Sequence, residues 1–488
     1  MSATAIYAVV LVLYMGLLAA VGLLTSRRMR SAEDYYLGGR KVGPWVTSLS
    51  YVAAYFSSVV IVGGGGFAYR YGMATLWIGA INVLVGCTLA WIVLGRRLRR
   101  LTERLETMTV PGFLAERFQT NGIRVFTALV IALFLIIYNV SNLQGMGRMF
   151  EVLMGLPYEA GVLLAGAIII LYVSFGGYLT VVWTGFFQAW VMGFGLILLT
   201  VAALKAVGGL SAANLALASI DSGLVTTPGL WGWAGLISFS LIVSFGVWGM
   251  PQLVVRFFSI RTADVLRIGT VVATIGGSMA VLPYLNGAIA RVLHPNLTNP
   301  DHAIATLTKS VLSPWGSAIF LAGVIAAGMS TFASILIITS SAVVRDIAQK
   351  GFGLALTERR VVRWSRAVSA IVGVIALGIA LRPPALVLVL TAFAFAVIAS
   401  TCLWPILFGL YWKRATRAGV LASSIGGFVM ALVWMAIGSP FGLHGFIPGI
   451  GVSLVLLLAV SGLTQRLPAD HVERVFAEGG SRAGEAGD

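Results

Sequence analysis

Apolar stretches long enough to cross a lipid bilayer recur along the whole chain, and this feature most restricts how it can fold. A membrane-spanning helix needs roughly 20 mostly apolar residues, whereas barrel strands are short and alternate between apolar and polar residues. The sequence therefore predicts an all-α integral membrane protein with about 13 transmembrane helices and no separate soluble domain. The predicted spans are 5–25, 45–70, 73–95, 123–148, 160–178, 183–205, 233–255, 266–290, 315–344, 362–381, 385–412, 417–438 and 443–463.

The basic residues predict how the chain is oriented. Of the 33 Lys and Arg residues, 27 lie in the tail and in the loops after spans 1, 3, 7, 9 and 11. Because basic loops stay on the cytoplasmic side, the N-terminus is expected outside and the C-terminus inside a multi-pass protein of the cell inner (plasma) membrane. Topology thus accounts for the net charge of +16, and no nucleic-acid partner is predicted. No feature indicates an obligate protein partner. The other six basic residues are Arg70, Arg148, Lys205, Arg291, Lys309 and Arg382.

Acidic residues and histidines are missing from the middle of every predicted span. All 17 Asp and Glu residues and all 4 His residues fall in loops, at span ends or in the tail. This distribution argues against a membrane haem protein, against a proton pump with an intramembrane relay and against a membrane hydrolase with a base beside its nucleophile. The two cysteines lie in apolar runs, so neither a disulfide framework nor a metal cluster is expected. The chain is predicted not to be an enzyme.

The ninth predicted span combines an apolar sequence with many hydroxyl groups. Its segment "AAGMSTFASILIITSS" (326–341) holds six of them. Neutral oxygens can replace the water shell of a monovalent cation without adding charge to the membrane interior. Small hydroxyl residues also allow close helix packing and bond back to their own helix. From the sequence alone, both a cation site and simple packing are open.

Two other spans contain features that interrupt helices. A cluster of small and hydroxyl residues at 53–58 lies in the middle of span 2, and the four glycines Gly63–Gly66 follow it. Span 7 places Gly246, Gly249 and Pro251 close together. Glycine weakens a helix, proline frees a carbonyl, and a broken helix within a membrane is tolerated where it lines a cavity. The glycines could instead serve close packing.

The two interrupted spans begin two blocks of five spans each, 45–205 and 233–412. An odd number of spans per block inserts the second block upside down, and broken helices at matching positions of inverted repeats indicate a transporter's central site. A five-plus-five inverted-repeat core is therefore expected. The remaining parts are a first peripheral helix with its loop (1–44), an extracellular loop (206–232), two peripheral spans (413–463) and a cytoplasmic tail (464–488).

Several motifs, in order, resemble the sodium:solute symporter family over nearly the full chain. They include "YYLGGRKVGPW" (35–45), "TVPGFLAERF" (109–118), "LYVSFGGYLTVVWTGFFQ" (171–188), "PQLVVRF" (251–257) and "GMSTFAS" (328–334). Within that family the chain looks most like the sodium/pantothenate branch. The pieces behind this finer resemblance are "GGGGFAYRYG" (63–72), "GLPYEAGVLL" (155–164), "HPNLTNPD" (294–301), "RPP" (382–384) and "GLYWKRATRAG" (409–419).

The resemblance implies sodium-driven uptake of a small organic solute by alternating access, with the solute expected to be a carboxylate such as pantothenate or another monocarboxylate. It implies a sodium ion bound between spans 2 and 9. The ligands so implied are the carbonyls of Ala53, Phe56 and Ala327 and the hydroxyls of Ser330 and Thr331. Candidates for contact with the solute are Tyr55, Ser57, Ser58, Asn82, Asn139, Asn142, Ser244 and Trp248.

Two positions depart from the family pattern. Gly185 stands where the family usually has Asp, and Gln252 stands where it commonly has His. The first change puts a second coupling site in doubt. The sequence leaves three alternatives open: a sensor or receptor that keeps the transporter fold, a sodium channel, and a symporter for another solute class such as an amino acid or a sugar. Two valines at 59 and 60 make the region beside the break apolar and disfavour a sugar.

Overall fold

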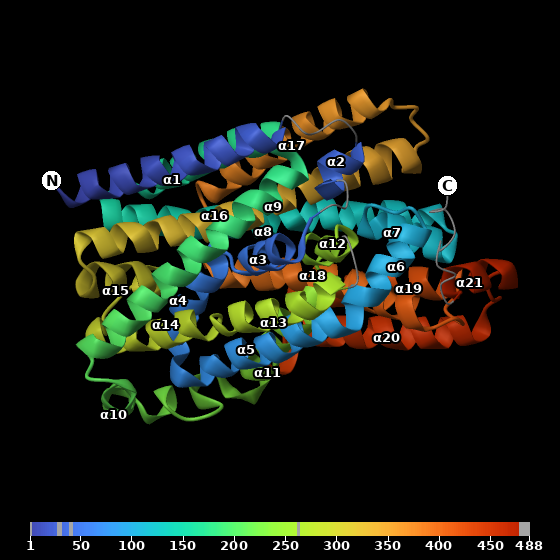
Figure 1. Cartoon of the computed structure of the whole chain (residues 1–488). Coiled ribbons are helices and arrows are strands. Elements are labelled where there is room, and N and C mark those ends of the chain that lie inside the picture. Colours follow the sequence, from blue (N-terminus) through green and yellow to red (C-terminus); the bar gives the residue numbers. More distant parts are fainter. Residues whose placement is uncertain (1, 27–31, 39–41, 261–263, 478–488) are drawn as a thin grey trace.

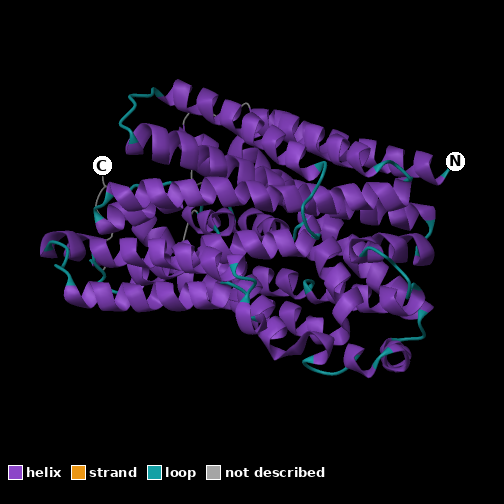
Figure 2. Ribbon diagram, turned by 180° about the vertical axis from the view of Figure 1, so that it is seen from behind, coloured by secondary structure: helices purple, strands orange, loops and turns teal. Residues whose placement is uncertain are grey.

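The computed structural model describes residues 2–26, 32–38, 42–260 and 264–477, and helices dominate all four ranges (Figure 2). The predicted all-α class is confirmed. The α-helices are α1 (Ala3–Ser26), α2 (Ala32–Leu37), α3 (Pro44–Tyr55), α4 (Gly64–Tyr71), α5 (Leu76–Ile81), α6 (Arg96–Arg104), α7 (Val110–Phe118), α8 (Asn121–Met154), α9 (Tyr158–Ala206), α10 (Leu210–Ile220), α11 (Gly232–Phe245), α12 (Pro251–Phe258), α13 (Asp264–Ser278), α14 (Val281–Leu293), α15 (Ala303–Val311), α16 (Pro314–Ser341), α17 (Glu358–Ala380), α18 (Val387–Tyr411), α19 (Arg417–Ala436), α20 (Phe446–Leu463) and α21 (Ala469–Phe476).

The long helices run side by side along one axis (Figure 1). Helices α10 and α15 lie at one end, here named the α10 end, and α2, α6, α7 and α21 lie at the other, the α21 end. The first residues of α1 are at the α10 end and α21 is at the other, so the first and last described helices begin and finish at opposite ends of the bundle. Between these two helices the described chain crosses the bundle an odd number of times.

Eleven helical segments of the described chain are long and apolar enough to cross a membrane. The segment Val59–Arg104 counts once although the chain reverses within it at Gly72, where φ is +74°. The predicted fifth and sixth spans share α9, which is kinked at Gly177 with φ 56°. The predicted second span is divided between α3 and α4.

Helix α16 is the central helix of the bundle. It packs against α9, α8 and α1, and its most apolar stretch is completely buried inside the protein. A helix that meets protein on all sides can carry polar groups wherever neighbours supply hydrogen-bond partners. The six hydroxyls of 326–341 are therefore compatible with its place in the fold.

Candidate functional site

The first part of the site is the break in the second predicted span. Helix α3 ends at Tyr55, and Phe56 adopts an extended conformation with φ −79° and ψ 123°. The chain becomes helical again in η2 (Val59–Gly63) and continues into α4. Because the last carbonyls of a helix have no helical donors, the end of α3 presents backbone oxygens inside the bundle. The predicted break near 53–58 is confirmed.

The four glycines after the break lie in helical backbone and serve packing. A Cβ atom on Gly65 would lie 2.2 Å from the side chain of Ile304. A Cβ atom on Gly287 of α14 would lie 2.0 Å from the carbonyl oxygen of Gly65. The glycines thus let the backbone of α4 approach α14 and α15 closely. Of the two roles open from the sequence, the structure supports close packing.

The second break is in the seventh predicted span. Helix α11 ends at Phe245, a tight turn η8 (Gly246–Gly249) follows, and Met250 is extended with φ −82° and ψ 112°. Helix α12 then begins at Pro251, whose missing N–H costs nothing in the first turn of a helix. Glycines and proline therefore interrupt this span as the sequence predicts.

The predicted cation ligands come together at the first break. The Ser330 hydroxyl lies within donating distance of Ala53 O, at 2.6 Å, and of Ala327 O, at 2.9 Å. The Thr331 hydroxyl lies 3.4 Å from Phe56 O. All five residues are buried. The carbonyl of Ala54, 3.2 Å from Thr331 Oγ1, also faces this cluster, and no signal in the sequence pointed to it.

A buried guanidinium lies one helical turn from these oxygens. Arg256 of α12 is 1% exposed and donates to Ser50 Oγ of α3 and, at 2.7 Å, to Ser334 Oγ of α16. Its guanidinium also lies 5.1 Å from the centre of the Tyr178 ring. The sequence predicts Arg256 in the loop after span 7, which is wrong, because Arg256 lies within α12 and is buried. Through its bonds to Ser50 and Ser334, Arg256 connects α3 and α16, the two helices that also supply candidate cation ligands.

Gly185 lies beside Ser50, the residue to which Arg256 donates a hydrogen bond. A Cβ atom at position 185 would lie 3.2 Å from Ser50 Oγ, the hydroxyl that Arg256 binds. Within the described chain, Arg256 forms no ion pair with a carboxylate. The acid usual at position 185 in the family would therefore stand next to this guanidinium, and its absence leaves a positive charge near the candidate cation site.

The candidate solute residues form two groups around the first break. In one, the Tyr55 hydroxyl donates to Asn82 Oδ1, and Trp248 Nε1 donates to Val85 O at 2.9 Å. A Cβ atom on Gly86 would lie 2.8 Å from the Tyr55 hydroxyl and 3.4 Å from Ser244 O, so Ser244 borders the same group.

The second group lies against α8. The Ser58 hydroxyl donates to Asn142 O at 2.8 Å, and the Tyr138 hydroxyl donates to Ser57 Oγ at 3.4 Å. Asn139 is buried, and neither its Nδ2 nor its Oδ1 has a hydrogen-bond partner in the described chain. Ser244 Oγ of the first group is also buried without a partner there. Buried polar atoms without partners are costly, so these atoms are available to a bound solute.

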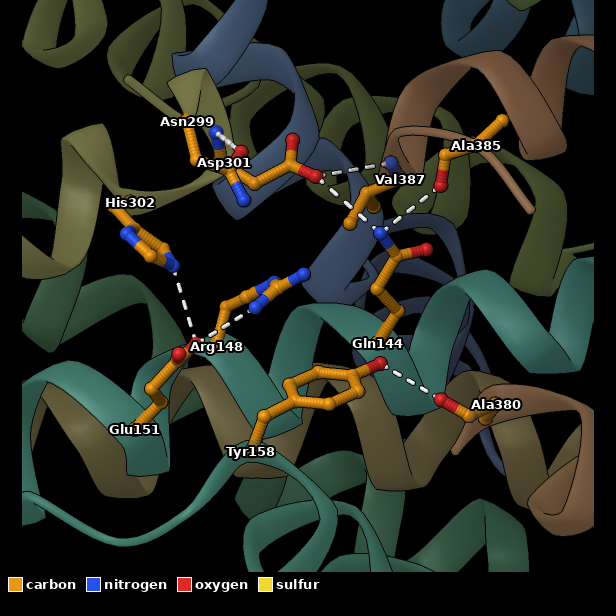
Figure 3. A network of polar contacts seen from close by, with 10 residues as sticks. All are labelled: Gln144, Arg148, Glu151, Tyr158, Asn299, Asp301, His302, Ala380, Ala385 and Val387. Carbon is orange, nitrogen blue, oxygen red and sulfur yellow. Dashed lines mark hydrogen bonds and ion pairs between the residues drawn. The ribbon is translucent and has the colours of Figure 1, made fainter. Parts of the chain in front are cut away.

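A polar network joins three segments at the α10 end (Figure 3). Asp301 lies in η9 (Pro300–His302), is 2% exposed, and accepts from Val387 N of α18 at 3.2 Å and from Gln144 Nε2 of α8 at 3.4 Å. Nearby, Glu151 pairs with Arg148 at 2.8 Å and with His302 at 3.1 Å. The network closes the α10 end between α8, η9 and α18.

Burial makes the carboxyl of Asp301 harder to ionise. It raises the pKa of Asp301 from 3.8 to about 6, although the Val387 N–H bond and the charge of Arg148 act in the opposite direction. The sequence placed Asp301 in a loop, which is correct, but gave no sign that the loop folds inward over the bundle.

A second carboxylate joins segments toward the α21 end. Asp346 lies in η10 (Ala342–Gly351), the continuation of α16, and accepts from Thr109 Oγ1 at 2.8 Å. The same Thr109 oxygen accepts from Gly112 N and so caps α7. This bond ties the segment before α8 to the end of α16, as the Asp301 network ties η9 to α8.

Comparison with known proteins gives a consistent result. The sodium:solute symporter family matches residues 35–427. The osmoregulated proline transporter OpuE of Bacillus subtilis (strain 168) is 32% identical over 470 residues, covering 93% of this chain and 94% of the relative. A sodium/proline symporter of Staphylococcus aureus is 32% identical over 460 residues, covering 90% and 89%. These relatives carry proline, so the pantothenate branch stays a prediction.

Solved structures show the same fold. A sodium-coupled sialic acid symporter in a substrate-bound, outward-open state matches with a TM-score of 0.79 at 18% identity, covering 95% of this chain and 99% of that one. Mhp1, a nucleobase-cation-symport-1 family transporter in a closed conformation, matches with a TM-score of 0.54 at 14% identity, covering 90% and 97%. At these identities the likeness concerns the fold alone.

Proposed function

This chain belongs to the sodium:solute symporter family, and from that premise we propose that the small solute it carries with sodium is an anionic monocarboxylate such as pantothenate. The protein is a multi-pass membrane protein and a sodium-coupled symporter, not an enzyme.

The proposed sodium ligands are the oxygens at the first break. Three carbonyls (Ala53, Phe56, Ala327) and the hydroxyls of Ser330 and Thr331 lie in one buried cluster. All are neutral hard oxygens, the ligand type that suits a hard monovalent cation. The cluster joins α3 to α16, so binding of a cation there would couple the two helices. This chemistry supports the assignment.

Charge balance is the observation that carries the proposal for the solute. The candidate solute residues are Tyr55, Ser57, Ser58, Asn82, Asn139, Asn142, Ser244 and Trp248, and all are neutral. Arg256 adds a positive charge near the ion, and Gly185 offers no carboxylate to offset it. In a medium of low dielectric, a bound cation without a counter-charge is costly. A carboxylate on the solute supplies that counter-charge.

The relatives favour a second candidate, L-proline. Proline also presents a carboxylate, but its ammonium group adds a positive charge, so that one sodium and one proline would carry net charge across the membrane. A monovalent carboxylate with one sodium carries none. The electrical behaviour of transport therefore separates the two solutes.

We expect uptake of pantothenate or lactate into proteoliposomes to require a sodium gradient and to change less than about twofold when a potassium–valinomycin potential is imposed. A potential of 100 mV acting on one net charge would supply about 2.3 kcal/mol, or roughly 50-fold. Replacing sodium with choline is the control and should abolish uptake. Sodium-dependent uptake of L-proline that grows strongly with an inside-negative potential, with none of either acid, would reject the monocarboxylate.

The proposed orientation puts the α10 end outside and the α21 end in the cytoplasm. The start of α1 and helix α21 lie at opposite ends of the bundle, and the basic loops predict which end is inner. The proposed inverted repeats are 45–205 and 233–412. Their matching breaks, after Tyr55 and after Phe245, support this division.

With this orientation, the network around Asp301 closes the outer end, and its stability depends on pH. Opening would hydrate the carboxyl and return its pKa from about 6 toward 3.8. The closed form then binds a proton more tightly than the open form, so acid favours closure. Between about pH 7.5 and about pH 5.5, linkage shifts the balance toward closure by about fourfold.

We therefore expect the apparent affinity for external sodium, measured from uptake into cells, to fall about fourfold over this range of external pH. Asp301→Asn should make the affinity independent of pH. The solute carboxyl stays largely ionised throughout. Arg148, Glu151 and His302 face the same network, so His302→Gln is the control and should keep the fall. A fall that persists in Asp301→Asn would disprove the role of this carboxyl.

A further inference from the structure

A cavity of about 490 Å³ opens at the α10 end, apart from the first break. It is bordered by Tyr69 and Arg70 at the end of α4, Arg291 of α14, the loop residues Leu297–Pro300, and Leu386 just before α18. Pockets for small ligands commonly have volumes of roughly 300–1,000 Å³. The cavity therefore has room for a small organic molecule.

The lining of the cavity is basic. Its residues include two arginines and no Asp or Glu. Arg70 and Arg291 are also two of the six Lys and Arg residues outside the basic loops and tail. Neither forms an ion pair with a carboxylate of the described chain. Two unneutralised guanidinium groups at one cavity attract an anion, and an arginine can bind a carboxylate through two hydrogen bonds.

The two arginines differ in their contacts. Arg291 is held in place: it donates to Pro295 O at 2.8 Å, and its guanidinium lies 5.0 Å from the centre of the Tyr69 ring. Tyr69 is fixed in turn, because its hydroxyl donates to His294 O and accepts from Leu297 N. Arg70 is exposed, with its guanidinium 5.3 Å from the Tyr71 ring. The cavity thus combines one guanidinium held by Pro295 and Tyr69 with one exposed guanidinium at its border.

The cavity lies directly over the closed outer end. Asn299 and Pro300 belong to its lining, and the next residue is Asp301, which accepts from α8 and α18. On the other side, a Cβ atom on Gly66 of α4 would lie 2.9 Å from Pro300 O. The segment 299–301 therefore separates the cavity from the interior. A solute in the cavity would be outside this barrier.

We propose that this cavity is an outer binding site for the carboxylate of the transported solute. Arg291 and Arg70 would bind the carboxylate, and Leu386, Leu297 and Pro300 would contact its apolar part. The proposal rests on the proposed function, since it takes the solute to be an anionic monocarboxylate. The site raises the local concentration of solute at the closed end, so that solute is present when segment 299–301 moves.

The test compares Arg291→Gln and Arg70→Gln with Lys205→Gln, an exposed basic residue at the outer end of α9 that does not line the cavity. Initial rates of sodium-driven uptake are measured in proteoliposomes with labelled pantothenate and lactate, at low and high ionic strength. Electrostatic capture can raise encounter rates tenfold or more. Each Arg→Gln variant should raise KM about five- to tenfold, keep Vmax within about twofold and lose much of the salt dependence. Lys205→Gln should match the unaltered protein.

Arg291→Lys keeps the charge and should restore much of the KM together with its salt dependence, whereas an effect on Tyr69 alone would leave the salt dependence unchanged. An unchanged KM in both Arg→Gln variants, or a fall in Vmax at unchanged KM, would overturn the outer site. If the unaltered protein carries L-proline and neither acid, the proposed function fails. The same variants measured with L-proline, which also bears a carboxylate, then decide the outer site separately.

Discussion

Replacing Ser330 and Thr331 together with alanine is expected to abolish sodium-driven uptake while the protein still reaches the membrane. The change removes both hydroxyls from the candidate cation cluster and leaves only carbonyls from α3 and α16. A site with few ligands cannot replace two of them with water inside a buried cluster. We expect the apparent sodium affinity to fall at least about 100-fold, which corresponds to ~2.7 kcal/mol. Uptake measured as a function of sodium concentration reports this loss directly.

The same helix supplies a matched control. Ser340 and Ser341 are also adjacent, buried hydroxyl residues of α16, and they donate to Ile337 O and Ile338 O of their own helix. The double change Ser340→Ala and Ser341→Ala also removes two adjacent hydroxyls from α16 and should leave sodium dependence nearly intact. If the two double variants behave alike, or if Ser330→Ala with Thr331→Ala keeps normal sodium dependence, the cation assignment is wrong.

Gly287→Ala should reduce uptake almost as much as the double change at Ser330 and Thr331. The cause would be disturbed helix packing, because Gly287 is not among the candidate cation ligands. The added Cβ atom would lie 2.0 Å from the carbonyl oxygen of Gly65 and 2.6 Å from its carbonyl carbon. Both are backbone atoms, so α4 and α14 must separate. Overpacking in a close-packed interior typically costs about 1–3 kcal/mol and more where backbones collide. We expect little monodisperse protein in detergent and no uptake.

Gly378→Ala tests whether the loss of folded protein and uptake depends on the contact between α4 and α14. Gly378 lies within α17, and a Cβ atom there would meet no other atom within 4 Å. Alanine also favours helix over glycine by up to about 1 kcal/mol. This variant should therefore be neutral or slightly stabilising in size-exclusion and thermal-stability assays. A well-folded Gly287→Ala protein with normal transport would show that the α4–α14 contact yields more easily than the structure indicates.

Much of the fold could be predicted because the membrane simplifies the problem. Long apolar runs located the spans, and the residues that interrupt helices located both breaks, at 53–58 and at Gly246–Pro251. These are local properties of the chain. The role of Gly63–Gly66 was not local: whether a glycine breaks a helix or admits a neighbour depends on what lies opposite, here α14 and α15.

The candidate site could be predicted in part. Ser330 and Thr331 stood out as neutral oxygens in an apolar run, while the carbonyl ligands came from the family resemblance. Ala54 was missed because any residue has a carbonyl, and only the exact end of α3 determines which ones face α16. The sodium assignment itself stays a prediction until the double variant is measured.

The buried charged residues were missed for a different reason. Asp346 meets Thr109 across 237 positions of the chain, and Arg256 meets Ser50 across 206. Each looks like an ordinary loop or helix-end residue in the sequence. Their burial follows from tertiary contacts between distant segments, for which a single sequence carries no periodic signal.

The burial of the apolar stretch of α16 on all sides has a consequence for how the protein is made. A helix that ends up surrounded by protein must first enter the bilayer, before its neighbours are in place to receive it. A charged side chain at the centre of an inserting helix costs about 2.5–3.5 kcal/mol, whereas Ser and Thr can satisfy their hydroxyls on their own helix during entry. In α16, Ser334, Ser340 and Ser341 bond to carbonyls of their own helix. A helix can therefore carry hydroxyl ligands into the membrane before any neighbouring helix is present. This gives a biosynthetic reason why the centre of this bundle uses hydroxyls and not carboxylates.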